Sequence, residues 1–494
     1  MLYSCINHYM QQGVYPIMLT IQWNRLSSLL AKCLTFLCLL IFAFSIWNSY
    51  VTVKETLFVR TLISAPVIII TMLLLILLTY LCNTYFSKTT FIILLTLCAF
   101  ATRFIWILKI PTPVESDFAL MYESAVQAAH GNYSFSSSPY YTTWVYQLGF
   151  TMYQAFVIKL FGNHIFILKL LNVLYCTGTT LCVYGITSKI FNEWTGRIAG
   201  LLYAFYISSI MMSSVLTNEH LATFLFYLGF YLLVTKGLHS KYTWIFVGIT
   251  LALGDIMRPL GSLILLAVII YLFLHGFLGK DKKTMFTTTK KLIGILVVFY
   301  AVHYIVSSLF IATGVTIYPL SNRDPLWKFA IGLNHETAGS YSTSDAEQIL
   351  SLEIGEERKA LEIKLIKERI ADKEKLFTLF GDKFSSMWGD IDSAGYWSLN
   401  QLNKKELIDT SMKYEKYVYM ATMLFGVIGL LSLLFTRQKN LHYTLFLLLI
   451  IGYISVHFLI EIQTRYRYFI IPSFFIIQSY GIYVIHQYMR KKTI

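Results

Sequence analysis

Long apolar runs without a charged residue recur along this chain of 494 residues, for example at 63–81 and 421–435. A run of roughly 20 apolar residues spans a bilayer as a helix, because a helix satisfies its own backbone hydrogen bonds in lipid. A membrane barrel would need short alternating strands, which this sequence does not show. Only 13% of the residues are charged, against about a quarter in soluble proteins. The sequence therefore predicts an all-α polytopic membrane protein.

The apolar runs predict about twelve transmembrane helices, with the N- and C-termini on the same side of the membrane. Their expected positions are 27–48, 62–82, 90–110, 165–188, 198–214, 219–235, 242–257, 260–278, 292–313, 417–436, 441–460 and 466–487. The apolar stretch 144–161 would invert every later loop if it crossed the membrane. We therefore expect it to lie in the outer interface as an amphipathic helix, with its Trp and Tyr residues at the level of the headgroups.

With this topology, basic residues collect in the connections on one side, which the positive-inside rule makes cytoplasmic. They are Arg25, Lys88, Lys189, Arg197, Lys236, Lys241, Lys280, Lys282, Lys283, Lys290, Lys291, Arg437, Lys439, Arg490, Lys491 and Lys492. Both termini are then cytoplasmic, and the net charge of +14 follows from topology. No nucleic-acid partner is needed to explain it.

The opposite side has a different charge pattern. No Lys or Arg occurs between Lys109 and Lys159, and acidic and basic residues nearly balance over 314–416. The second segment is expected to be an α-rich extracytoplasmic domain, helical in its middle (345–380) and looped near 318–341 and 387–402. The predicted organisation is an N-terminal region with two transmembrane helices (1–89), a transmembrane module with its first outer loop at 111–163 (90–313), the soluble domain (314–416) and C-terminal transmembrane helices (417–494).

The first apolar run is expected to be a retained helix, because no small-residue cleavage site follows it. Either Met1 or Met18 could be the true start. The cysteines at positions 5, 33, 38, 82, 98, 176 and 182 all lie outside the soluble segment. The sequence therefore predicts no disulfide framework and no CxxC metal site.

Four stretches on the outer side follow one another in a recognisable order. They are Glu115-Ser116-Asp117 with a short helix ending at His130-Gly131; Leu160-Phe161-Gly162 followed by Leu168, Leu170 and Asn172; Thr217-Asn218-Glu219 with Arg258-Pro259; and Arg465-Tyr466-Arg467-Tyr468 with Pro472. Together they resemble the GT-C glycosyltransferases, in particular family 39, with the protein O-mannosyltransferases and the bacterial aminoarabinose transferases. The resemblance covers about 90–313 and 417–487. The soluble segment departs from it by lying between spans.

The resemblance implies a multi-pass enzyme of a bacterial cell membrane with its active site on the extracytoplasmic face. Such an enzyme transfers a sugar from a polyprenyl-phosphate donor, with undecaprenyl phosphate as the implied carrier. The attack on the anomeric carbon is a single displacement. The sugar stays open, and so does the acceptor, which could be a protein, a lipid or an envelope glycan.

By the same resemblance Asp117 is the catalytic carboxylate, acting as general base or orienting the acceptor. Its alternative role is to cap a helix over 118–130. Glu219 is a second candidate, binding the acceptor or a divalent metal ion, and its alternative is a favourable charge in the first turn of a helix. Glu115 could join Asp117 and Glu219 as a metal ligand.

For the leaving phosphate the candidates are Arg258, Arg465 and Arg467, since the guanidinium fork matches phosphate oxygens. Lys159 and Lys169 are further candidates. Their alternative is that long basic side chains snorkel to the headgroups. The enzyme hypothesis predicts a lipid-accessible cavity that holds Asp117 opposite Arg258 and Arg465.

Asp255 is expected to pair with Arg258, one turn away, and His220, His303 and His457 are expected to have structural roles. A transporter or lipid flippase is an alternative function, although such proteins place ionisable residues near the bilayer midplane and show related halves. A non-catalytic partner in envelope synthesis is a third.

Overall fold

The computed structural model describes residues 14–55, 61–237, 240–278, 280–436 and 440–492. Met1, Cys5, Arg437 and Lys439 lie outside these ranges. Every regular element within them is helical, which confirms the predicted all-α class for the described part of the chain.

Within the described ranges, six helices are long and apolar enough to cross a membrane. They are α2 (Val14–Glu55), α3 (Thr61–Tyr85), α4 (Lys88–Lys109), α8 (Ile165–Ile190), α14 (Lys282–Ala312) and α20 (Lys405–Phe435). Three shorter apolar helices accompany them, namely α12 (Thr243–Met257), α13 (Gly261–Gly276) and α21 (Thr444–Leu459). The remaining helices of the bundle are α9 (Glu193–Ala204), α10 (Ile207–Met212), α11 (Glu219–Tyr231) and α22 (Ile471–Lys492). The chain is a polytopic membrane protein by these features, and the number twelve stays a prediction.

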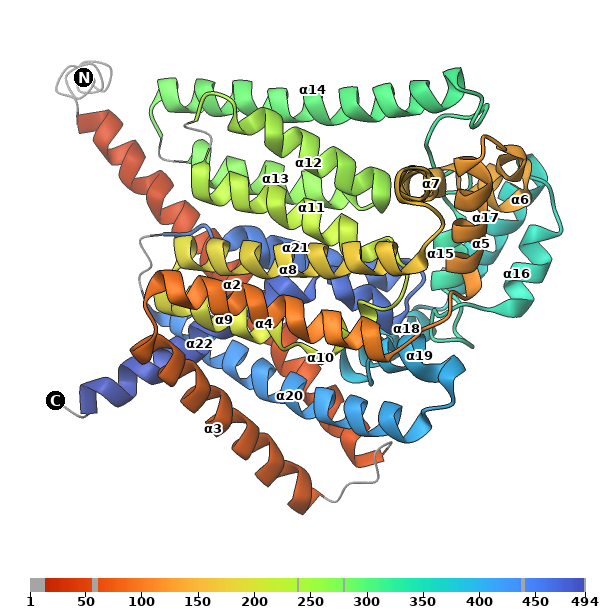
Figure 1. The fold of residues 1–494 in the computed structure, drawn as a ribbon. Helices are drawn as coiled ribbons and strands as arrows, with labels where there is room; N and C mark the ends of the chain where they lie inside the picture. Colours follow the sequence, from red (N-terminus) through yellow and green to blue (C-terminus); the bar gives the residue numbers. More distant parts are fainter. Residues whose placement is uncertain (1–13, 56–60, 238–239, 279, 437–439, 493–494) are drawn as a thin grey trace, which may run out of the picture.

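The other helices gather at one end of the bundle. The first loop forms α5 (Ser116–Ala129), α6 (Pro139–Thr143), the 3₁₀ turn η2 (Val145–Gln147) and α7 (Leu148–Phe161). The second group, which we call the outer domain, contains α15 (Trp327–Gly332), α16 (Thr343–Leu350), α17 (Glu356–Ala371), α18 (Lys373–Phe384), η4 (Ser385–Gly389) and α19 (Ala394–Leu399). Figure 1 places both groups at the right, whereas α2 begins and α22 ends at the left.

The basic residues mark the opposite end of the bundle, which we call the basic end. There Lys88 lies 3.3 Å from Glu193, and the Arg490 guanidinium lies 5.3 Å from the Trp194 ring centroid. Lys291 Nζ donates to the Ser240 carbonyl. The basic connections and the connections with few cations thus lie at opposite ends of the bundle, as the charge pattern predicts. Which end faces the cytoplasm stays a prediction.

The helix α7 coincides with the stretch 144–161 that was expected in the interface. In Figure 1 it is seen along its axis while the bundle helices run across the picture, so it lies crosswise to them. Gly149 lets it approach α12 closely, since a Cβ there would come within 2.1 Å of the Ile256 carbonyl oxygen. A crosswise helix at the end of the bundle is the arrangement expected of an interfacial segment.

One expected span is divided in the structure. The segment 198–214 was predicted as a single helix, but α9 ends at Ala204 and the short α10 follows. The buried Arg103 of α4 donates to the carbonyls of Tyr203 and Ala204, at 3.0 and 2.9 Å, and to Ser209 Oγ. These bonds satisfy carbonyls that the break leaves without helical partners, so the break does not leave them unpaired inside the bundle.

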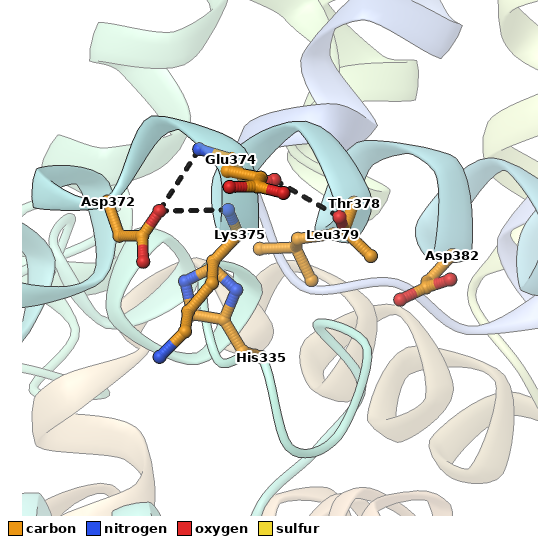
Figure 2. A pocket seen from close by; sticks show the side chains of 7 residues that line it. All are labelled: His335, Asp372, Glu374, Lys375, Thr378, Leu379 and Asp382. Atoms are coloured by element: carbon orange, nitrogen blue, oxygen red, sulfur yellow. Dashed lines mark hydrogen bonds between the residues drawn. The ribbon is translucent and has the colours of Figure 1, made fainter.

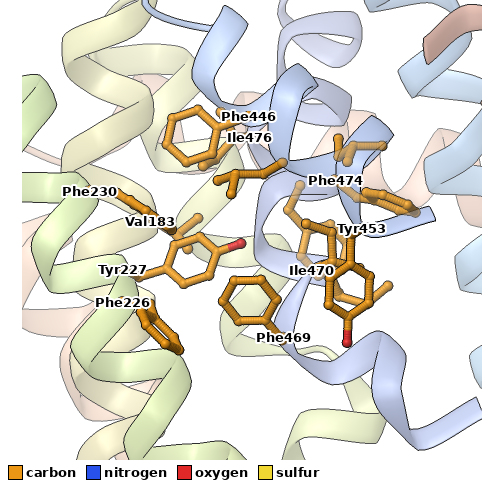
Figure 3. Packing of buried hydrophobic residues seen from close by; sticks show 14 of the residues in the cluster. Val183, Phe226, Tyr227, Phe230, Phe446, Tyr453, Phe469, Ile470, Phe474 and Ile476 are labelled. Carbon is orange, nitrogen blue, oxygen red and sulfur yellow. The ribbon is translucent and has the colours of Figure 1, made fainter. Parts of the chain in front are cut away.

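Aromatic packing connects the helices that carry the candidate site. Figure 3 shows Phe226 and Tyr227 of α11 beside Phe469 and Tyr453. The Phe469 ring lies 5.5 Å from both Phe226 and Tyr453, and it ends the 3₁₀ segment η6 (Thr464–Phe469). Tyr453 Oη donates to the Tyr466 carbonyl at 2.7 Å. This core therefore fixes η6 against α11 and α21.

The outer domain is joined to the segment that follows α21. The Glu461 amide donates to the Lys328 carbonyl and the Ile462 amide to the Gly339 carbonyl, each at 2.9 Å. A Cβ on Gly332 would lie 2.2 Å from the Ile460 carbonyl carbon, so the two backbones touch. The flanks of the outer domain were expected to be loops, but they contain α15 and α19. Each of these short helices is buried on one side.

Candidate active site

A cavity of about 1120 Å³ lies where the first loop, the outer domain and the ends of the bundle helices meet. Its lining includes Asp117, Arg258 and Arg465. Apolar side chains of α13 and α21, among them Leu266 and Val456, form another part of the wall and are exposed on the bundle surface. The cavity thus combines charged groups with an apolar side that can face lipid.

Two arginines share one carboxylate at this site. Glu219 in the first turn of α11 is buried, and its Oε1 accepts from Arg258 Nη1. The same oxygen lies 3.6 Å from Arg465 Nε. The Oε2 atom of Glu219 has no hydrogen-bond partner among the described residues. Two cations and one anion leave this cluster with one excess positive charge, which suits an anionic ligand.

Aromatic rings hold the two guanidinium groups in place. Arg258 lies 5.1 Å from the Tyr466 ring centroid. Arg465 lies 4.5 Å from the Trp397 ring and 4.9 Å from the Phe118 ring. Stacked guanidinium groups keep their N–H donors free at the ring edge while their faces are covered. Arg465 is thereby positioned by residues from α5, α19 and η6.

Asp117 faces the cavity from the first turn of α5. The N-cap of α5 is Glu115, so the capping role considered for Asp117 is wrong. Within the described residues its carboxylate forms no hydrogen bond or ion pair. Burial among protein atoms raises the pKa of Asp117, and Arg465 and Lys328 oppose that shift. The side chain is still exposed, so it is a carboxylate without a partner among the described residues, in the same cavity as Arg258 and Arg465.

A second ion pair lines the same cavity. Lys328 of α15 donates to Glu461 Oε2, and Glu461 Oε1 accepts from Gln463 Nε2 at 3.0 Å. Burial lowers the pKa of Lys328, but nearby Tyr466 and Glu461 outweigh that effect and raise it. The sequence analysis missed this pair. Lys328 is one cation among the balanced charges of the outer domain, whereas Glu461 could have been noticed as an acid at the end of a span.

A family model matches the part of the chain that contributes the transmembrane residues of this site. Residues 148–305 match the model of a family described as dolichyl-phosphate-mannose-protein mannosyltransferase. The resemblance to the GT-C glycosyltransferases is confirmed. The matched segment includes Glu219 and Arg258, whereas Asp117 and Arg465 lie outside it. No curated protein matches this chain. The family match supports a glycosyltransferase of the GT-C type in a multi-pass membrane protein.

Not every residue predicted for the GT-C site reaches the cavity. Arg467 is buried and lies 3.3 Å from Asp392 Oδ2, and it also donates to the Asp390 carbonyl. Lys159 is exposed at the end of α7, and Lys169 donates to the Thr112 carbonyl at 2.6 Å. These three residues do not line the cavity.

The expected pairing of Asp255 with Arg258 is wrong. Asp255 Oδ2 lies 2.9 Å from His303 Nε2 on α14, and its other oxygen accepts from the Gly261 amide. Arg258 turns to Glu219 because it is the C-cap of α12, with an extended backbone (φ −149°, ψ 121°) that leaves the helical path. Two further histidines also contact protein groups. His220 contacts Tyr468 Oη at 2.7 Å, and His457 contacts the Tyr453 carbonyl.

The carboxylates considered as metal ligands do not form a cluster. Within the described ranges no group of three or more His, Cys, Asp or Glu side chains has the spacing to hold a metal ion. Glu219 is occupied by its two arginines. Glu115 and Asp117 are neighbours in sequence, but Glu115 does not line the cavity.

A smaller pocket of about 370 Å³ lies on the outer domain and shares no lining residue with the large cavity. Figure 2 shows its polar groups. Asp372 caps α18 by accepting from the amides of Glu374 and Lys375, at 3.0 and 3.1 Å. The Thr378 hydroxyl donates to the Glu374 carbonyl. Because these contacts build the helix end, the pocket offers no arrangement comparable to Asp117 and the arginines.

Proposed function

We propose that this glycosyltransferase transfers a sugar from a polyprenyl-phosphate donor to an extracytoplasmic acceptor. The observation that carries the proposal is the shared cavity, which is lined by the Asp117 carboxylate and by the two arginines that contact Glu219. The proposal also rests on the family match and on the apolar cavity wall of α13 and α21. The carrier we favour is undecaprenyl phosphate in a bacterial cell membrane.

In this mechanism the donor phosphate binds Arg258 and Arg465, and its prenyl chain leaves the cavity along Leu266 and Val456. Before transfer the phosphodiester carries one negative charge, which matches the excess charge of the arginine cluster. In this mechanism the anomeric carbon lies between the arginines and Asp117. The lipid-exposed side chains give the chain a path that avoids water.

The reaction is one displacement. The oxygen of the acceptor hydroxyl bonds to the anomeric carbon while the bond from that carbon to the phosphate oxygen breaks. Asp117 takes the hydroxyl proton. The phosphate leaves with a second negative charge, which Arg258 and Arg465 stabilise as it develops. A single displacement inverts the configuration at the anomeric carbon.

The experiment uses the full chain in proteoliposomes with undecaprenyl-phosphate-linked sugars and an envelope extract as acceptor source. Release of undecaprenyl phosphate is followed by mass spectrometry, for the wild type and for Asp117→Asn. Envelope fractions from cells with and without the protein are compared for a missing glycosyl mass. Release by the wild type that is lost in Asp117→Asn supports the proposal. Equal release by both proteins, or uptake of sugar without a covalent product, contradicts it.

A further inference from the structure

Three residues outside the arginine pair connect the outer domain to the cavity. We propose that Lys328, Glu461 and Gln463 form a relay that positions Arg465 for binding the donor phosphate. This inference rests on the proposed function. It assigns to the outer domain a role in donor binding.

The relay is a continuous chain of polar contacts. Arg465 Nη2 donates to Gln463 Oε1 at 3.1 Å, and Gln463 Nε2 donates to Glu461 Oε1 at 3.0 Å. Glu461 Oε2 accepts from Lys328 Nζ. On its other side Arg465 faces Glu219. The orientation of Arg465 is therefore set by contacts from two directions.

The amide of Gln463 gives the relay its direction. Its oxygen must face the Arg465 donor and its nitrogen must face the Glu461 acceptor. A flipped amide would place donor against donor and acceptor against acceptor. The only arrangement that satisfies both ends keeps a cation on one side of Gln463 and an anion on the other. Gln463 thus needs an acceptor oxygen of Glu461 that is held in place.

Lys328 supplies that condition. Glu461 is buried, and a buried carboxylate without a counter-ion is costly. Without Lys328, Glu461 loses its ion-pair partner, and the acceptor that orients Gln463 is no longer fixed. Because the Glu461 amide also donates to the Lys328 carbonyl, the backbone keeps this pair in register. The outer domain therefore acts on Arg465 through Lys328.

A direct role of Lys328 in phosphate binding makes a different prediction. If Lys328 bound the phosphate itself, Glu461→Gln would free its ammonium group and strengthen binding. In the relay, Glu461→Gln removes the anion that orients Gln463 and weakens binding. The same variant therefore separates the two roles by the sign of its effect.

The test measures binding of farnesyl phosphate, a short prenyl phosphate, to the full chain in nanodiscs. Gln463→Met and Lys328→Met are expected to weaken binding about tenfold, as for loss of a hydrogen bond to a charged group. Lys328→Arg is expected to bind farnesyl phosphate more tightly than Lys328→Met and nearly as tightly as the wild type, since it keeps the cation. In the Arg465→Gln background Gln463→Met has no further effect, because the relay acts only through Arg465. Lys359→Met, an exposed outer-domain lysine paired with Glu356, is the matched control.

The outcomes distinguish the relay from the function on which it rests. If Arg258→Gln and Arg465→Gln bind farnesyl phosphate as tightly as the wild type, the proposed function fails. If those variants lose binding but Gln463→Met does not, the relay is overturned and the function stands. Multiplying effects of Gln463→Met and Arg465→Gln, or tighter binding by Glu461→Gln, also overturn the relay. Thermal unfolding of each variant identifies one that does not fold, and Gln463→Met then carries the test alone.

Discussion

Asp117 and Arg465 line the same cavity, but no ion pair joins their side chains within the described residues. Arg465 still acts on Asp117 through space, since it opposes the rise in the pKa of that carboxyl. The two groups therefore interact electrostatically and open into one cavity without being paired to each other. The proposed mechanism uses this arrangement, with the donor phosphate at Arg465 and the anomeric carbon toward Asp117.

Replacing Asp117 by Asn is expected to remove catalysis without removing donor binding. The amide keeps the shape of the side chain but cannot accept the hydroxyl proton, and loss of a general base costs about 10²–10⁴-fold in rate. Farnesyl phosphate affinity should stay equal or rise, because one negative charge near the arginines is gone. Turnover is measured by release of undecaprenyl phosphate, and binding in nanodiscs. Retained turnover would exclude the base role.

The rate of transfer should fall toward acid at a higher pH than an ordinary aspartate would cause. Burial raises the pKa of Asp117, so the carboxyl takes up a proton earlier as the pH falls and then cannot act as base. For the same reason the charged carboxylate lowers the free energy of unfolding. This destabilisation is fully present above the raised pKa of the folded protein and is lost below the ordinary pKa of an aspartate. A pH profile of turnover, with Asp117→Glu as comparison, checks the acidic limb. A profile flat down to the ordinary range of aspartate would contradict the prediction.

Sequence patterns singled out three residues at helix ends that line one cavity in the structure. Asp117, Arg258 and Arg465 each stand at a helix start or end on the side with few cations, and topology alone brings such positions to one surface. The family resemblance added the expectation of chemistry there. The fold class followed from the apolar runs, because lipid permits little besides helices.

The partners of these residues could not be predicted. A spacing of three residues places Asp255 beside Arg258 only if the helix continues, and α12 ends before Arg258. Arg103 stabilises the break between α9 and α10, and nothing in its local sequence indicates that contact. Lys328 carries no local signal, because its partner Glu461 comes from a segment distant in sequence. Each case depends on tertiary contacts that spacing does not contain.

Replacing Glu219 by Gln is expected to destabilise the protein. The variant leaves Arg258 and Arg465 without their shared anion, and removing one partner of a buried ion pair costs roughly 3–5 kcal/mol. Glu219→Asp keeps the charge and should lose less. The midpoint of thermal unfolding in detergent checks the order of the two variants. Added farnesyl phosphate should recover part of the loss in Glu219→Gln, since the phosphate supplies the missing negative charge. No recovery would argue against a phosphate at the arginines.

Arg467 provides a contrast to Arg465, two residues away in the same 3₁₀ segment. Its guanidinium is buried against Asp392 and the Asp390 carbonyl, so it joins η6 to the outer domain and does not face the cavity. Arg467→Met should therefore lower stability by roughly 3–5 kcal/mol and leave farnesyl phosphate affinity of the folded protein unchanged. Arg465→Met should weaken farnesyl phosphate binding and have little effect on stability, since that side chain is partly exposed to the cavity. Asp392→Asn is the matched control and should resemble Arg467→Met, because either change breaks the same pair. If Arg467→Met instead weakened phosphate binding while its unfolding midpoint stayed that of the wild type, both arginines would have to act on the donor.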